Sequence, residues 1–212
     1  IFYFIASYLM NIKHRINARK IALSYFYQNC FFHFMQKGLQ KTESESRSEV
    51  ATETSTQNVW GFFDKEFMDQ LLKTREAQEH VDEYVKAKIT EYAGDLDIES
   101  DFGYFLSYFF DQWEAWEVDV EYVLKVGAGL PRYRLELIEK VNQYTQSFKY
   151  DQMDVLDQAC LLLGYVEYKV IETPKELVIN EMVELCNRYS DSGSPKLING
   201  LLHQIFLAEE HK

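Results

Sequence analysis

The sequence predicts an all-α fold, and three observations lead to that prediction. Apolar residues make up 47% of the 212-residue chain, which is enough for a sizeable core. Only 9 glycines and 3 prolines are present, too few for a fold that is rich in turns. Long stretches repeat apolar residues every three or four positions, which is the period of an amphipathic helix. The chain therefore predicts one helical domain or two small packed helical subdomains.

The first predicted helix spans residues 13–36 and is apolar on two sides. One side carries Ala18 and Tyr25, and the other carries Tyr27 and Phe31 at helical spacing. A helix with two apolar sides is usually enclosed by other helices. We therefore expect the first helix to lie between its neighbours in the fold.

Residues 1–9 are apolar but too few to span a bilayer. No basic residue precedes them, so a signal peptide is not expected. Met10 opens a segment typical of a native start, and we expect residues 1–9 to be a non-native or disordered lead. Three scattered cysteines (Cys30, Cys160 and Cys186) fit small buried thiols in a reducing cytoplasm rather than a disulfide framework or a zinc site.

The middle of the chain changes character twice. Residues 37–58 are polar and lack an apolar period, which predicts a linker. Helical patterning returns over residues 59–93 and 102–124. The second of these stretches is dense in aromatic residues with acidic residues between them. Because carboxylates repel phosphate, a helix core is favoured over a surface that stacks nucleic-acid bases.

The last third of the chain predicts four more helical segments. Gly127, Gly129 and Pro131 predict a break or kink, and helices at 133–148 and 152–168 follow.

Two helix starts carry explicit signals. Thr173 predicts a cap, with Pro174 in the first helical position and Glu176 completing a capping box. Ser194 and Pro195 start the last helix in a similar way. One polar side of that helix carries Lys196, Asn199 and His203.

Charge is segregated along the chain. The first 42 residues contain six Lys and Arg and no Asp or Glu, whereas the rest contain 16 basic and 34 acidic residues. A basic segment attracts phosphate, and an acidic body can meet a basic protein partner. Arg15 and Arg19 are four residues apart and share one face of the first helix.

The sequence does not predict an enzyme. It has no Glu-x-x-His pair, no phosphate-binding loop and no nucleophile elbow, and we expect no cofactor and no metal. Asp151, Asp154 and Asp157 are spaced by three, which could suggest a metal site. The favoured interpretation is a solvated face or an acidic cluster at a helix N-terminus.

Three segments of the chain resemble the NusB family. The segment Asn17-Ala18-Arg19-Lys20-Ile21-Ala22-Leu23-Ser24-Tyr25-Phe26-Tyr27-Gln28, preceded by Arg15, resembles the arginine-rich first helix of that family. The stretch 156–167 is similar to its central C-terminal helix. The stretch 173–205, with TPKELVINEMVELCNRY followed by SPKLINGLLHQI, is similar to its closing pair of helices.

The resemblance implies a bundle of two helical subdomains with a long insertion after the first helix. We expect an N-terminal subdomain over residues 10–146 and a C-terminal subdomain over residues 147–212. The first would include the polar linker 37–58 and a helical insertion at 59–118, for which the family has no counterpart.

The resemblance also implies a transcription antitermination factor rather than an enzyme. NusB-like proteins bind boxA-like single-stranded RNA of ribosomal RNA transcripts together with the ribosomal protein NusE, as part of the RNA polymerase antitermination complex. No membrane partner is implied. Carried over by position, the expected RNA-binding residues are Lys13, Arg15, Arg19, Tyr27, Lys196, Leu197 and Asn199. Asp157 is the expected contact with the protein partner, and Arg19→Glu is expected to weaken RNA binding without unfolding.

Departures from the family pattern leave alternatives open. Leu197 stands where the family often has Phe, and Val166 replaces the tyrosine of a Tyr-Glu pair. The loop before Pro174 is one residue short. One alternative is a helical interaction scaffold that has lost RNA binding. Another is an RNA-binding domain related to those of ribosomal RNA methyltransferases.

Overall fold

The computed structural model describes residues 2–48, 102–103, 105–106 and 118–210. The long elements within these ranges are all α-helices, which confirms the predicted all-α class. They are α1 (Phe2–Ser48), α5 (Val120–Tyr144), α6 (Val155–Val170), α7 (Lys175–Tyr189) and α8 (Ser194–Glu210), with a short 3₁₀ helix at Tyr150–Gln152.

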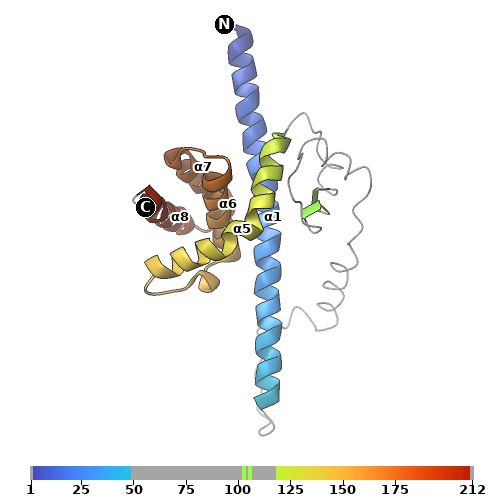
Figure 1. The fold of residues 1–212 in the computed structure, drawn as a ribbon, viewed down its shortest axis with the longest axis vertical. Coiled ribbons are helices and arrows are strands. Elements are labelled where there is room, and N and C mark those ends of the chain that lie inside the picture. Colours follow the sequence, from blue (N-terminus) through green and yellow to red (C-terminus); the bar gives the residue numbers. More distant parts are fainter. Residues whose placement is uncertain (1, 49–101, 104, 107–117, 211–212) are drawn as a thin grey trace.

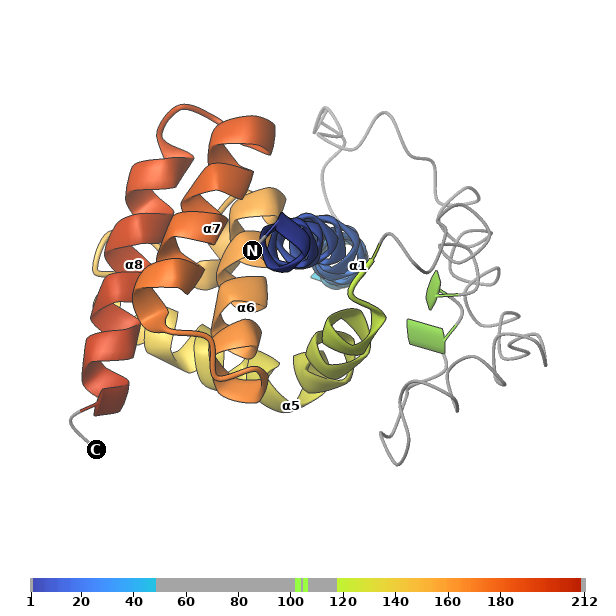
Figure 2. The ribbon, with the colours of Figure 1, turned by 90° about the horizontal axis from the view of Figure 1, so that it is seen from above.

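The helix α6 is the centre of the bundle. It contacts α1, α5, α7 and α8, and every residue from 157 to 167 is buried. Figure 2 shows α6, α7 and α8 side by side, with α1 crossing them at a steep angle and seen end-on. Close packing needs a small residue at Gly164, where an added Cβ would lie 2.8 Å from Met182 and 3.2 Å from Leu202. This glycine lets α6 approach α7 and α8.

The helix α1 is longer than the sequence predicts. It runs without interruption through 47 residues, about 70 Å at the rise of an α-helix, and both ends extend beyond the bundle (Figure 1). The expected linker at 37–58 is therefore helical as far as Ser48, and residues 2–9 are helical rather than a disordered lead. Lys and Glu favour helix strongly enough to continue one that tertiary packing has already nucleated.

The helix α5 confirms the kink predicted at Gly127, Gly129 and Pro131. It is one helix through Pro131, yet Figures 1 and 2 show that it bends partway along. Proline removes a backbone donor and its ring crowds the preceding turn, so the helix bends without ending.

The aromatic stretch before α5 contributes to the core where it is described. The ring of Phe102 lies 4.6 Å from that of Tyr25, and a Cβ at Gly127 would overlap it at 1.9 Å. Phe102 and Phe105 are buried, so the prediction of a helix core is confirmed for these two residues. The predicted helix 59–93 and most of the insertion 59–118 lie outside the described residues.

The start of α7 corrects the predicted capping box. The helix begins at Lys175, its N-cap is Pro174, and no side chain caps it. The carbonyl of Pro174 accepts hydrogen bonds from Leu177 N and Val178 N, each 3.0 Å long. Thr173 is buried instead, after a tight turn in which Glu172 has a φ of 58°.

The three cysteines are buried and free, as predicted. Burial raises the pKa of the Cys30 thiol, which keeps it neutral. No helix in the described ranges is both long and apolar enough to cross a membrane.

Candidate functional site

A buried ion cluster fixes α1 against α6 and α7. The Arg19 guanidinium donates to both carboxylate oxygens of Glu167, at 3.0 Å from Nε and 2.7 Å from Nη2. Its Nη1 lies 3.0 Å from Glu181 of α7. Tyr122 of α5 donates to the same Glu167 at 2.7 Å. These four side chains join four helices at one point.

The cluster is charged and nearly dry. The side chains of Arg19 and Glu167 are 6% and 0% exposed. Burial opposes the charge of Arg19, but the bonds to Glu167 outweigh it and raise the Arg19 pKa. Burial, and then the Glu167 carboxylate, raises the pKa of Tyr122 well above its ordinary value. Arg19 is therefore a cation that Glu167 and Glu181 hold in place.

Arg19, one of the expected RNA-binding residues, is buried in this cluster. Three of its N–H donors contact carboxylates, two on Glu167 and one on Glu181, and its side chain is only 6% exposed, so this position does not present it to an RNA phosphate. The sequence indicates a basic residue four positions from Arg15 but cannot indicate the carboxylate that lies 148 residues away on α6.

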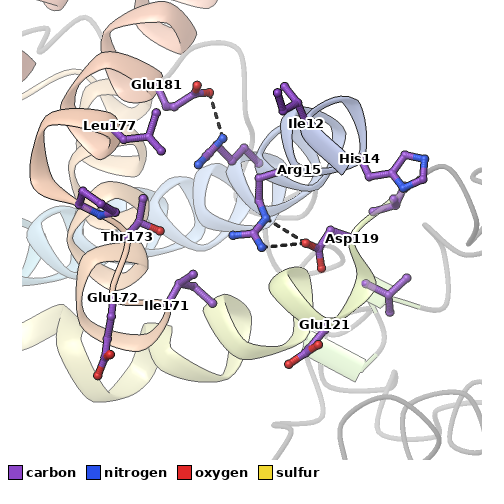
Figure 3. A pocket seen from close by; sticks show the side chains of 14 residues that line it. Ile12, His14, Arg15, Asp119, Glu121, Ile171, Glu172, Thr173, Leu177 and Glu181 are labelled. Atoms are coloured by element: carbon purple, nitrogen blue, oxygen red, sulfur yellow. Dashed lines mark hydrogen bonds and ion pairs between the residues drawn. The ribbon is translucent and has the colours of Figure 1, made fainter. Parts of the chain in front are cut away.

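Arg15 lies at the edge of a cavity of about 1050 Å³ between α1, the start of α5 and the loop before α7 (Figure 3). Its Nε and Nη2 both contact Asp119 Oδ2, at 2.9 and 2.8 Å. The guanidinium also lies 4.6 Å from the centre of the Tyr122 ring. Arg15 is one-third exposed, and a carboxylate already neutralises it.

The acidic groups outnumber the basic ones around this cavity. Figure 3 shows Glu121, Glu172 and Glu181 around it, together with Asp119. The local charge is thus unfavourable for RNA on the Arg15 side of α1.

The other side of α1 carries a different surface. Lys13, Lys20 and Tyr27 are seven residues apart in sequence, so they follow one line along the helix, whereas Arg15 lies about 200° from Lys13. Lys13 and Tyr27 are exposed and Lys20 is half-buried. The structure therefore divides the predicted RNA-binding residues of α1 between two faces.

A groove of about 440 Å³ follows this line between α1, the start of α6 and the end of α7. Its lining consists of Lys20, Leu23, Ser24, Tyr27, Leu156 and Tyr189. Tyr27 and Tyr189 are 41% and 49% exposed, so both rings are accessible from solvent. The groove thus combines a cation with two accessible rings.

The start of α8 lies beside this groove because Asp157 holds it there. Asp157 follows Leu156 of the groove, and its two carboxylate oxygens accept hydrogen bonds from Ser190 at 2.8 Å and Ser194 at 2.9 Å. Ser190 in turn follows Tyr189. Asp157 therefore holds the α7–α8 turn close to Leu156 and Tyr189, which line the groove.

Asp157, the expected contact with a protein partner, is itself buried. Both of its oxygens are used within the chain. Of the other acidic residues in the predicted cluster, Asp154 caps α6 by accepting from Leu156 N at 2.8 Å, and Asp151 pairs with Lys37. The favoured interpretation of an acidic helix start fits Asp154. No group of three or more potential metal ligands occurs in the part of the chain that the structure describes.

The predicted residues of α8 divide by exposure. Lys196 and Asn199 are exposed on one side of the helix, together with His203. Leu197 is half-buried and packs against the core, so little of its side chain is available to a ligand.

Of the six groove residues only Tyr27 belongs to the predicted set, and the two missing residues that matter most for RNA are the cation Lys20 and the exposed ring of Tyr189. Lys20 is detectable from the sequence, since it lies seven residues from both Lys13 and Tyr27. Tyr189 is not, because only the packing of α7 against α6 brings it opposite Tyr27.

The described helices and this groove define an all-helical protein with a basic and aromatic surface. A sequence model of the NusB family matches residues 91–206, more than half of the chain. The chain belongs to the NusB family. The matched range includes the predicted segments at 156–167 and 173–205, whereas the segment at 17–28 lies outside it.

Curated relatives agree with this assignment. A transcription antitermination protein NusB of Campylobacter lari is 30% identical over 101 residues, which are 48% of this chain and 76% of that protein. The protein of the same name from Streptomyces avermitilis is 34% identical over 86 residues, covering 40% and 60%. That of Crocosphaera subtropica is 31% identical over 84 residues, covering 40% of each. The chain thus spans less than two thirds of the last two relatives.

Proposed function

We propose that this protein is a transcription antitermination factor that binds boxA-like single-stranded RNA of ribosomal RNA transcripts. Its work in the cytoplasm is binding rather than catalysis. Membership of the NusB family supports the general role, because the relatives are named transcription antitermination proteins. One observation supports the RNA surface: the groove that sets Lys20 beside the exposed rings of Tyr27 and Tyr189.

The groove suits single-stranded RNA for physical reasons. Unpaired bases can stack on exposed aromatic rings, and lysine ammonium groups can neutralise the phosphates between them. Lys13 extends the groove along α1, and Lys196 and Asn199 extend it along α8. The proposed RNA-binding set is therefore Lys13, Lys20, Tyr27, Tyr189, Lys196 and Asn199, with Arg19 holding the helix that presents them.

We propose NusE as the protein partner within the RNA polymerase antitermination complex. The acidic excess of the chain after residue 42 supports a basic partner. Asp157 would act indirectly in this contact, by positioning the α7–α8 turn. Co-purification of purified NusE with this chain, at low and at high salt, tests the pairing; no complex at low salt would contradict it.

The test of the RNA surface is a fluorescence-anisotropy titration with labelled boxA-like RNA at fixed salt. Tyr27→Ala should weaken binding roughly 5- to 150-fold, since each base stacked on an aromatic ring contributes about 1–3 kcal/mol. Lys20→Gln should lower the slope of log K against log salt by about 0.7, the value for one phosphate on a single strand.

Lys125→Gln is the matched control. It removes the same charge from an exposed lysine of α5 that pairs with Glu121, away from the groove. If Lys20→Gln and Lys125→Gln alter RNA binding equally, the groove is not the RNA surface. If the wild-type chain binds no RNA, the scaffold alternative gains support.

A further inference from the structure

A second group of basic side chains lies where the later part of α1 meets α5. Asn29, His33 and Lys37 are four residues apart and share one face of α1. Arg134 of α5 reaches this face, where its Nη1 donates a hydrogen bond to Asn29 Oδ1. Asp151 of the 3₁₀ helix lies beside Lys37. We refer to these five residues as the Arg134 cluster.

Arg134 has an unsatisfied donor. Its Nη2 is buried and has no hydrogen-bond partner, and no carboxylate forms an ion pair with Arg134 in the part of the chain that the structure describes. The Arg134 side chain as a whole is only partly buried, but this nitrogen is shielded from water, and buried polar atoms are ordinarily hydrogen-bonded. An unsatisfied buried donor therefore points to an anion that belongs there.

The neighbours of Arg134 increase the positive charge. Lys37 is about half-exposed, and its partner Asp151 is the carboxylate that offsets it. Burial, and then the charges of Arg134 and Lys37, lower the pKa of His33, while Asp151 acts in the opposite direction. Two permanent cations face one carboxylate, so the cluster has an excess of one positive charge even with His33 neutral.

We propose that the Arg134 cluster is a binding site for a phosphate group. The guanidinium, the imidazole and the ammonium together offer donors from three side chains, which matches a group with several acceptor oxygens better than a carboxylate with two. The phosphate chemistry does not depend on the proposed function. The source of the phosphate is either free phosphate or the backbone of an RNA strand that leaves the groove at Tyr27. Only the second source rests on the proposed function.

The path from the groove to the cluster runs both along and around α1. Lys37 lies ten residues after Tyr27, about 15 Å along α1. The intervening Phe31 ring stacks on Tyr27 with centroids 6.2 Å apart and an angle of 14° between the planes. Around the helix axis Asn29 lies about 200° and Lys37 about 80° from Tyr27, so a strand bound in the groove would have to turn around α1 to reach the cluster through Lys37.

The first experiment uses the full chain and inorganic phosphate, without RNA. Thermal unfolding is measured in phosphate and in chloride of equal ionic strength. The wild-type Tm should rise with phosphate concentration, because a ligand that binds only the folded state stabilises it. Arg134→Gln should lose this rise, while its Tm in chloride stays near that of the wild type, since the arginine it replaces has an unsatisfied donor.

Arg132→Gln is the matched control. Arg132 is exposed and lies two residues before Arg134 on the same helix. It contacts the Tyr133 ring rather than the cluster. It should keep the wild-type response to phosphate. Equal phosphate responses in the wild type and Arg134→Gln would overturn the proposal.

A second readout does not depend on stability. The His33 ring protons, followed by NMR across pH, should report a higher pKa in phosphate than in chloride. Arg134, Lys37 and Asp151 are the charged groups that act on His33, so an anion placed among them favours the protonated ring. An unchanged His33 titration would count against the site.

The source is decided with two labelled RNAs, one that ends at the groove and one extended past it. If RNA supplies the phosphate, only the extended RNA should lose affinity with Arg134→Gln, and its salt slope should fall by about 0.7. If the Tm and NMR responses occur while both RNAs bind Arg134→Gln normally, the site takes free phosphate. If the wild-type chain binds neither RNA but its Tm and the His33 titration still respond to phosphate, the proposed function is contradicted and this site is supported.

Discussion

The buried ion pair of Arg19 with Glu167 contributes to the stability of the fold. Arg19→Met should lower the free energy of unfolding by about 3–5 kcal/mol, because it leaves the Glu167 carboxylate buried without its cation. Urea or guanidinium denaturation measures the change. A loss below about 1 kcal/mol would mean that the cluster is not a structural joint between the helices.

The double variant Arg19→Met with Glu167→Gln is the control for this prediction. It removes both charges, while the amide oxygen of the new glutamine can still accept from Tyr122, so most of the lost stability should return. For Arg19→Glu the structure predicts a different outcome from the one expected from the sequence. Two carboxylates would then meet in the interior, and the protein should unfold rather than merely bind RNA less well.

Asp119 is the residue that holds Arg15 away from any phosphate. An RNA that also passed the Arg15 side of α1 would gain one cation in Asp119→Asn, which should raise its affinity and increase the salt slope by about 0.7. Asparagine is a good N-cap, so the hydrogen bond from Tyr122 N at 3.0 Å is kept and α5 should be unharmed. Glu121→Gln removes an equal charge nearby and is the comparison; the same gain in both variants would rule out a specific role for Asp119.

Individual helices show which features a sequence can predict. The kink in α5 follows from local chemistry at Gly127, Gly129 and Pro131, and the sequence predicts it correctly. The capping box at Thr173 also follows local rules but is wrong, because packing buries Thr173 and a tight turn at Glu172 supplies the geometry instead. The continuation of α1 past residue 37 escapes prediction because its polar sequence has no apolar period.

The candidate site is predictable only in part, for the same reason. Lys13 and Tyr27 can be found from spacing along one helix. The partners of Arg19 and the location of Tyr189 depend on how α6 and α7 pack. The sequence does not predict which charged side chain will pair with a residue when the partner comes from a distant segment.

The α7–α8 turn is the element whose position determines the groove. Asp157→Ala removes the acceptor of two serine hydroxyls and should cost about 1–3 kcal/mol. Backbone amides in the first turn of α8 should exchange faster with solvent, and RNA binding should weaken although Asp157 does not face the groove. Asp154→Asn, which keeps the cap of α6, should leave both properties unchanged.

At the scale of the whole molecule, one ion cluster joins three helices at the C-terminal end. Glu209 of α8 accepts from Lys140 of α5 and Lys169 of α6. Burial opposes the charge on Glu209, but these two bonds outweigh it and lower its pKa. A lowered carboxyl pKa stabilises the fold above the unfolded value of about 4.3, and the contribution is lost as the pH falls through the lower folded value.

This cluster therefore predicts acid sensitivity. Between about pH 5 and pH 3 the wild-type chain should lose more stability than Glu209→Gln, whose amide does not titrate in this range. Denaturation curves at several pH values measure the difference. Parallel pH profiles for the two proteins would contradict the assignment.

The continuous helix α1 has one further consequence. Lys13 and Lys37 belong to the same rigid rod, so the roughly 24 residues between them fix their separation along the axis at about 36 Å. A single strand that contacted both would have to bridge that span. The fixed separation of Lys13 and Lys37 would then set the minimum length of an RNA that binds with full affinity.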